Sequence, residues 1–218
     1  MEDYRTIRGT ATGEYEEKKS RFIAQLSFAD SEEKAVAFLE QVRAANRTAR
    51  HNVYAYRLRE GNRERYSDDG EPAKTAGTPA LEVLQHSGLT DLVVVITRYF
   101  GGVLLGTGGL VRAYQGAVQA GLAASTIIDK KEGVHLAIGT DYTGLGKLQY
   151  LIAQQNLTLI DTVYTEKVEL QLMVPAEQQQ EVEKEIVEAT NGSARISWGE
   201  KVLYALVDKK IEIFEKNT

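Results

Sequence analysis

Five consecutive aliphatic residues, Leu92–Ile96, form an uninterrupted run rich in β-branched side chains. A strand of this composition presents apolar side chains on both faces, so both faces must be covered. The glycine-rich residues 101–109 follow and predict a turn, and apolar residues then recur every fourth position from Leu110 to Leu122. The sequence therefore predicts a buried strand, a glycine-rich turn and an amphipathic helix that packs against the sheet.

The residues before this strand predict the rest of a first domain. Residues 14–29 alternate weakly between polar and apolar side chains and are expected to form one or two strands. Asp30 is expected to cap a helix that ends near Ala45, and residues 51–58 are expected to form another strand. The polar segment 60–79 is rich in turn-forming residues and is expected to be a long, functional loop.

A different pattern begins after Lys130–Gly133, which we interpret as a linker. The elements expected beyond it follow the order βαββαβ, which is the order of ferredoxin-like domains. Their expected ranges are 134–140, 143–155, 157–165, 167–174, a helix opened by Pro175, and 194–198. The predicted fold class is α+β in two domains, residues 1–131 and residues 132–218.

The charges are distributed unevenly between these two parts. The first part holds 18 basic and 17 acidic side chains, and the second holds 8 and 14, which gives the net charge of −5. Twelve of the thirteen arginines lie in the first part, which suggests an anionic partner there, although a solvated surface has the same composition. The absence of cysteine excludes disulfides and thiolate metal sites. No signal-peptide pattern or long apolar run occurs, so a cytoplasmic protein without a membrane segment is expected.

Three motifs carry side chains that bind or react. The first is the stretch Arg43–Arg65, in which seven arginines are interleaved with Tyr54, Tyr56 and Tyr66. Arginines bind phosphates and tyrosines stack on bases, so the stretch suits single-stranded nucleic acid. Alternate residues of a strand point to opposite faces, however, so these charges need not converge.

The second motif is the acidic turn Asp68–Pro72, with three carboxylates in four residues. They could hold Mg²⁺ or act as acid and base with His51, or they could bond backbone N–H groups or pair with the arginines. The third motif runs from Arg98 to Gly109. Its glycines could expose N–H groups to an anion at a helix start, or could let helix and sheet pack closely. No Walker A or dinucleotide fingerprint occurs, and no cofactor is expected.

The motifs resemble those of the YigZ/IMPACT family. The resemblance rests on residues 49–56, on residues 67–72, on residues 75–79 and above all on residues 97–114, TRYFGGVLLGTGGLVRAY. It covers about residues 14–122, and the remainder resembles the second domain of bacterial members. One departure is Lys74, where the family usually has glycine. If that position needs a positive φ, lysine costs about 1 kcal/mol.

The resemblance implies both a fold and a function. The first domain is expected to be of the ribosomal-protein type seen in domain IV of elongation factor G, and the second to resemble domain V of that factor. Both relatives act on RNA and the ribosome, so a non-catalytic RNA- or ribosome-binding module that modulates translation is expected. Eukaryotic IMPACT regulates translation, which also implies a possible protein partner in translation control.

The candidate binding residues for an anion or RNA come from all three motifs. They are Arg50, His51, Tyr54, Tyr56, Asp68, Asp69, Glu71, Thr75, Arg98, Tyr99, Gly101, Gly102, Gly106, Gly108, Gly109 and Arg112. No catalytic residue and no metal ligand is assigned. Two alternatives remain at this point. One is an enzyme with a cleft of His51, Asp68, Asp69, Glu71 and Arg98, which requires these groups to converge. The other is a protein-binding regulator that uses the acidic second domain.

Overall fold

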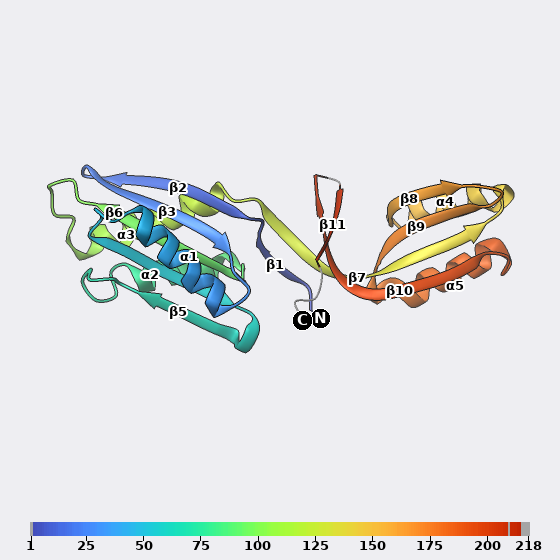
Figure 1. Ribbon diagram of the computed structural model, residues 1–218, viewed down its shortest axis with the longest axis horizontal. Coiled ribbons are helices and arrows are strands. Elements are labelled where there is room, and N and C mark those ends of the chain that lie inside the picture. Colours follow the sequence, from blue (N-terminus) through green and yellow to red (C-terminus); the bar gives the residue numbers. More distant parts are fainter. Residues whose placement is uncertain (1, 209, 215–218) are drawn as a thin grey trace. The chain divides into compact units, whose positions relative to one another are not determined.

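The computed structural model describes residues 2–208 and 210–214, and it divides into two compact units (Figure 1). The N-terminal unit comprises Tyr4–Ile128, and the C-terminal unit comprises the described residues from Asp129 onward together with Glu2 and Asp3. Each unit combines one sheet with helices, so the expected mixed class of helices and strands in two parts is observed. No helix in the described ranges is both long and apolar enough to cross a bilayer.

The N-terminal unit is built on a five-stranded sheet. Its elements are β1 (Tyr4–Ile7), β2 (Thr10–Glu17), β3 (Ser20–Phe28), α1 (Glu32–Ala45), β4 (His51–Leu58), η1 (Glu60–Asn62), β5 (Arg63–Ser67), α2 (Gly77–Ser87), β6 (Leu92–Tyr99) and α3 (Gly106–Ala123). The strand order is β2-β3-β6-β4-β5, and all neighbours are antiparallel. Strand β6 therefore lies in the middle of the sheet.

The central position of β6 follows from its composition. Val94 and Ile96 face a core that is completed by α2 and α3, whereas Val93 and Val95 face a second core that is completed by α1. All four side chains are fully buried. The predicted strand with two covered faces is thus confirmed. Because side chains alternate along a strand, Arg98 near the end of β6 lies on the same face as Val94 and Ile96, which is the face of α2 and α3.

Two local predictions for this unit were wrong. Helix α1 is capped by Ser31, whose Oγ accepts from the backbone N–H of Lys34, and not by Asp30, which pairs with the Lys34 ammonium instead. The expected loop 60–79 contains β5, an edge strand that pairs with β4. Strand β5 is exposed along most of its length, so it lacks the alternation that would have revealed it.

The C-terminal unit has the expected βαββαβ order with one further strand. Its elements are β7 (Ile127–Thr140), α4 (Tyr142–Gln154), β8 (Thr158–Tyr164), β9 (Val168–Pro175), η2 (Ala176–Gln178), α5 (Gln179–Thr190), β10 (Arg195–Val207) and β11 (Lys210–Phe214). The antiparallel order is β11-β10-β7-β9-β8, and α4 and α5 share one core with the sheet. The expected linker Lys130–Gly133 is wrong, because it lies inside β7, where Lys130 packs over the ring of Phe214.

Candidate functional site

A cavity of about 210 Å³ lies where β4 begins and β6 ends. It is lined by Arg50, His51, Arg98, Phe100 and Leu104. His51 and Arg98 are register partners in the antiparallel ladder, so their side chains emerge side by side on the same face of the sheet. The chain therefore brings together cationic groups from two motifs that lie almost fifty residues apart.

The guanidinium of Arg98 is held at the edge of this cavity by a buried carboxylate. Nη1 of Arg98 donates to both oxygens of Glu71, at 2.7 and 3.0 Å, and the hydroxyl of Tyr114 donates to the same carboxylate at 2.7 Å. The Arg98 and Glu71 side chains are only 9% and 3% exposed. Burial, and then the negative charge of Glu71, raise the pKa of Tyr114. This network ties the acidic turn to β6 and to α3.

The Arg98 guanidinium carbon lies 5.4 Å from the ring centroid of Phe22 and 5.7 Å from that of Phe100, but the other edge of the group forms no hydrogen bond to the described residues. Nε is buried and forms no hydrogen bond within residues 2–208 and 210–214, and Nη2 likewise donates to none of them. The Nε–H and Nη2–H bonds of an arginine point in parallel and match two oxygens of a carboxylate or phosphate. A buried donor without an acceptor costs about 1–3 kcal/mol, so this edge is suited to an anion.

Asp68 accepts hydrogen bonds from backbone N–H groups and is not among the residues that line the cavity. Its Oδ1 accepts from the backbone N–H groups of Ala76 and Gly77, at 3.1 and 2.8 Å, and its Oδ2 accepts from that of Lys74 at 2.9 Å. It thereby satisfies donors at the start of α2, where the helix has no side-chain cap of its own. Lys74 has a φ of 62°, so the position does require left-handed backbone.

Asp69 and His51 are also engaged locally. Asp69 accepts from the backbone N–H of Asn52 at 2.6 Å and pairs with Arg43 at 3.3 Å. Nδ1 of His51 lies 2.7 Å from the carbonyl oxygen of Asp69. A carbonyl only accepts, so Nδ1 carries the proton and Nε2 is the nitrogen left for other contacts.

The three acids of the turn therefore do not converge with His51 on a common point. Each carboxylate bonds backbone N–H groups or pairs with an arginine. This is the arrangement expected if the acidic turn stabilises the fold instead of acting as acid and base. No group of three or more His, Asp or Glu side chains in the described part of the chain is placed to hold a metal ion. The geometry that the enzyme hypothesis required is not found among these residues.

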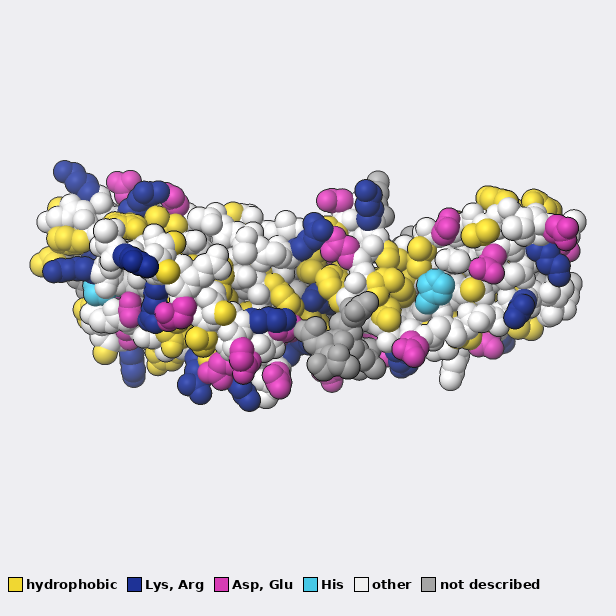
Figure 2. Space-filling model, viewed as in Figure 1, with side chains coloured by type: hydrophobic (Ala, Val, Ile, Leu, Met, Phe, Trp, Pro, Cys, Tyr) yellow, Lys and Arg dark blue, Asp and Glu magenta, His cyan; other side chains and the backbone are white. Residues whose placement is uncertain are grey.

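The arginine stretch is largely neutralised by neighbouring acids. Its ion pairs join Arg43 to Glu40 and Asp69, Arg57 to Glu64, Arg59 to Asp91, and both Arg63 and Arg65 to Glu32. Within the described ranges only Arg47 and Arg50 of this stretch form no ion pair. Figure 2 accordingly shows basic and acidic side chains interspersed on the visible face of this unit. The expected basic stripe is therefore not continuous.

Two of the three tyrosines of the same stretch, Tyr54 and Tyr56, pack against the fold, whereas Tyr66 is 43% exposed. The rings of Tyr54 and Tyr56 lie 6.2 Å apart and nearly parallel, and Tyr56 is 2% exposed. The Tyr56 hydroxyl donates to Glu32 at 2.6 Å. Burial, followed by this hydrogen bond, raises the pKa of Tyr56. Tyr56 thus has little surface left on which a base could stack.

The glycine-rich segment serves two purposes. A side chain at Gly101 would overlap the backbone of Lys19, so this glycine allows close packing, whereas Gly102 and Gly106 have φ values of 85° and 70°. Helix α3 begins at Gly106, ahead of Gly108 and Gly109. Between β6 and α3 the loop leaves Phe100 and Leu104 exposed, at 51% and 83%.

Only part of the predicted site is brought together. Arg50, His51 and Arg98 line the cavity, with Glu71 bonded to Arg98. Of the others, Thr75 donates to the carbonyl of Pro72, Tyr99 donates to the side chain of Asn46, and Arg112 is exposed on α3. The sequence prediction missed Phe100 and Leu104. Large apolar side chains in a glycine-rich turn were the signal that could have revealed them.

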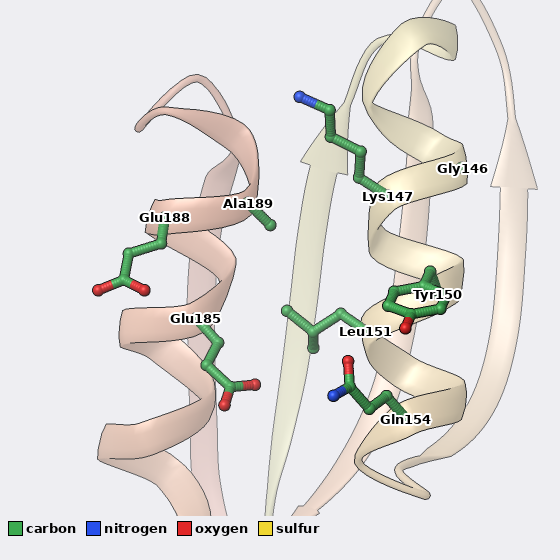
Figure 3. A pocket seen from close by; sticks show the side chains of 8 residues that line it. All are labelled: Gly146, Lys147, Tyr150, Leu151, Gln154, Glu185, Glu188 and Ala189. Atoms are coloured by element: carbon green, nitrogen blue, oxygen red, sulfur yellow. The ribbon is translucent and has the colours of Figure 1, made fainter.

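A larger groove of about 660 Å³ lies in the C-terminal unit between α4 and α5 (Figure 3). Tyr150 on α4 is 71% exposed beside it, and Leu151 forms part of its wall. Figure 3 shows Glu185 and Ala189 of α5 on the opposite side. The side-chain amide of Gln155 donates to Glu185 at 2.8 Å, so this carboxylate is already bonded.

The fold and the site define a protein of two α/β units whose N-terminal unit carries a small basic cavity. Residues 18–122 match the Impact N-terminal domain, and residues 138–193 match a domain of unknown function (DUF1949). The chain is 36% identical to the IMPACT family member YvyE of Bacillus subtilis over 92% of this chain and 93% of that protein. It is also 36% identical to the IMPACT family member YigZ of Escherichia coli, over 90% and 98%.

The chain belongs to the IMPACT family, as its motifs predicted. A crystal structure described as that of a hypothetical protein matches with a TM-score of 0.58 and 36% identity, over 92% of this chain and 98% of that one. The Protein IMPACT homolog of Dictyostelium discoideum is 40% identical over 95 residues, which are 41% of this chain and 27% of that protein.

Proposed function

We propose that this protein is a non-catalytic module that binds RNA, alone or within the ribosome, and thereby modulates translation in the cytoplasm. The observation that carries the proposal is the buried Nε of Arg98, which has no hydrogen-bond partner among the described residues, beside a cavity that Arg98 lines together with Arg50 and His51. A phosphate oxygen supplies the acceptor that this edge lacks. Exposed Phe100 at the same cavity offers a ring on which a base stacks.

The link to translation is supported by the family rather than by the cavity.

The domain types are part of the same proposal. We assign the N-terminal unit to the ribosomal-protein type of elongation factor G domain IV, and the C-terminal unit to the ferredoxin-like type of its domain V. The βαββαβ order and the antiparallel strand order β10-β7-β9-β8 support the second assignment.

The ion pairs of the arginine stretch limit how many phosphates this surface contacts. With two or three cations at the cavity, the slope of log K against log salt for single-stranded RNA is about −1.4 to −2.1. Affinity then falls roughly 7- to 20-fold between 50 and 200 mM salt. If all seven arginines of the stretch contacted phosphates, the slope would be about −5 and the loss close to a thousandfold. The measured slope therefore distinguishes binding at the cavity alone from binding along the whole arginine stretch.

The experiment is a titration of labelled single-stranded oligoribonucleotides, followed by fluorescence anisotropy at several salt concentrations. Arg50→Glu should weaken binding about tenfold or more, because it reverses a charge at the cavity. Arg47→Glu is the matched control, since Arg47 is equally unpaired among the described residues but does not line the cavity. Absence of affinity for RNA at about 50 mM salt, or an equal loss in both variants, would refute the proposal.

A further inference from the structure

We infer that the cavity is a site for a terminal phosphomonoester of an RNA strand, at its 5′ or its 3′ end. The inference rests on the proposed function and specifies its ligand. The cavity, at about 210 Å³, is smaller than the roughly 300–1,000 Å³ of pockets that enclose whole small molecules. It therefore accepts a group rather than a nucleotide. A phosphate within a chain is joined to nucleotides on both sides, whereas a terminal phosphate is joined to a nucleotide on one side only. A small cavity can therefore enclose a terminal phosphate through a single opening.

The donors around the cavity suit a phosphomonoester. A terminal phosphate carries about −1.5 to −2 charges near neutral pH and three unesterified oxygens, whereas a phosphodiester carries one charge. The free edge of Arg98 provides two parallel N–H donors, and Arg50 provides a second guanidinium. His51 adds an Nε2–H donor when its ring is protonated, because Nδ1 already donates to Asp69.

The pairing of the cavity's two guanidinium groups also favours the more highly charged ligand. That of Arg98 is paired with Glu71, whereas Arg50 forms no ion pair among the described residues. Arg50 is then the cation without a counter-ion in this set, so a dianion gains more than a monoanion from entering.

The apolar residues of the loop complete the site. Nε of Arg98 is shielded from solvent, so an oxygen reaches this edge only after a small movement of the adjoining side chains. Phe100 and Leu104 line the cavity and are half or more exposed, so they can rotate without disturbing a packed core. The ring of Phe100 lies 5.7 Å from the guanidinium carbon of Arg98 and is half exposed, so the terminal base can stack on it beside the bound phosphate.

The test compares four oligoribonucleotides of one short sequence: with a 5′-phosphate, with a 3′-phosphate, with both ends as hydroxyls, and with both ends phosphorylated. The preferred phosphorylated form should bind about tenfold or more tightly than the hydroxyl form. Inorganic phosphate at millimolar concentration should remove that advantage. Comparison of the 5′ and 3′ forms shows which end the cavity takes.

Two variants locate the effect. Arg50→Ala should abolish the advantage of the phosphorylated oligomer, whereas Arg47→Ala should preserve it. Both residues are exposed, so neither change should affect folding, which circular dichroism would verify. Equal affinity for all four oligomers would overturn this inference and leave the proposed function intact. Persistence of the advantage in Arg50→Ala would also overturn it, and absence of binding to every oligomer at low salt would overturn the proposed function itself.

Discussion

Replacement of Tyr114 by phenylalanine tests whether the buried network that positions Arg98 is as strong as its geometry indicates. Tyr114 is fully buried, and its hydroxyl donates to the Glu71 carboxylate at 2.7 Å. Phenylalanine keeps the ring and its edge-to-face contact with Phe22, so the change removes a hydrogen bond and little packing. A hydrogen bond to a charged acceptor contributes about 1.5–3 kcal/mol. Since Glu71 retains Arg98, we expect a loss of about 2 kcal/mol.

The assay is urea denaturation followed by far-UV circular dichroism. Trp198, the single tryptophan, lies in β10 of the C-terminal unit, so its fluorescence does not report directly on the N-terminal unit. Tyr150→Phe is the matched control, because Tyr150 is largely exposed and should change the free energy of unfolding by less than about 0.5 kcal/mol. A loss below about 0.5 kcal/mol for Tyr114→Phe would refute the reasoning, as would full additivity with Glu71→Gln.

Three further predictions concern stability and ionisation. Lys74→Gly should raise the free energy of unfolding by about 0.5–1 kcal/mol, because φ is 62° there, whereas Lys74→Ala should not; urea midpoints distinguish them. Gly101→Ala should lower the thermal midpoint, because its Cβ would overlap backbone, whereas Gly108→Ala, which lies in α3 and meets only the end of an arginine side chain, should leave it unchanged or raise it. In an alkaline titration read at 295 nm, Tyr4, whose pKa burial raises to about 12, and Tyr114 should ionise after the exposed tyrosines. Because folding raises these pKa values, their stabilising contribution is present below about pH 10 and is lost above it; ionisation of all tyrosines together near pH 10 would contradict this.

Features that depend on local sequence were predictable. Leu92–Ile96 specify a strand with two buried faces through composition alone. The prediction of a linker at Lys130–Gly133 was wrong because the structure of this segment depends on a contact with a residue that is distant in sequence. A charged residue breaks the apolar pattern in sequence, but Lys130 is buried and its ammonium lies 4.1 Å from the ring centroid of Phe214.

The candidate site was only partly predictable, because the availability of a charge depends on partners that are distant in sequence. Glu32 neutralises Arg63 and Arg65 from about thirty residues away, and Asp91 does the same for Arg59. Nothing in the local composition of the arginine stretch reveals these pairings. The convergence of His51 with Arg98 likewise arises from the β4–β6 register, which is fixed by the whole sheet.

The acidic turn illustrates how one motif combines fold and function. Asp68 accepts from backbone N–H groups at the start of α2, and Glu71 pairs with Arg98, so two of the carboxylates that suggest catalysis stabilise the fold instead. By occupying only Nη1, however, Glu71 fixes the guanidinium and leaves the opposite edge without a hydrogen-bond partner among the described residues. A cation held in this way retains two aligned donors and loses little side-chain entropy when an anion binds. The same ion pair that argues against an acid–base cleft therefore favours a preorganised site for phosphate.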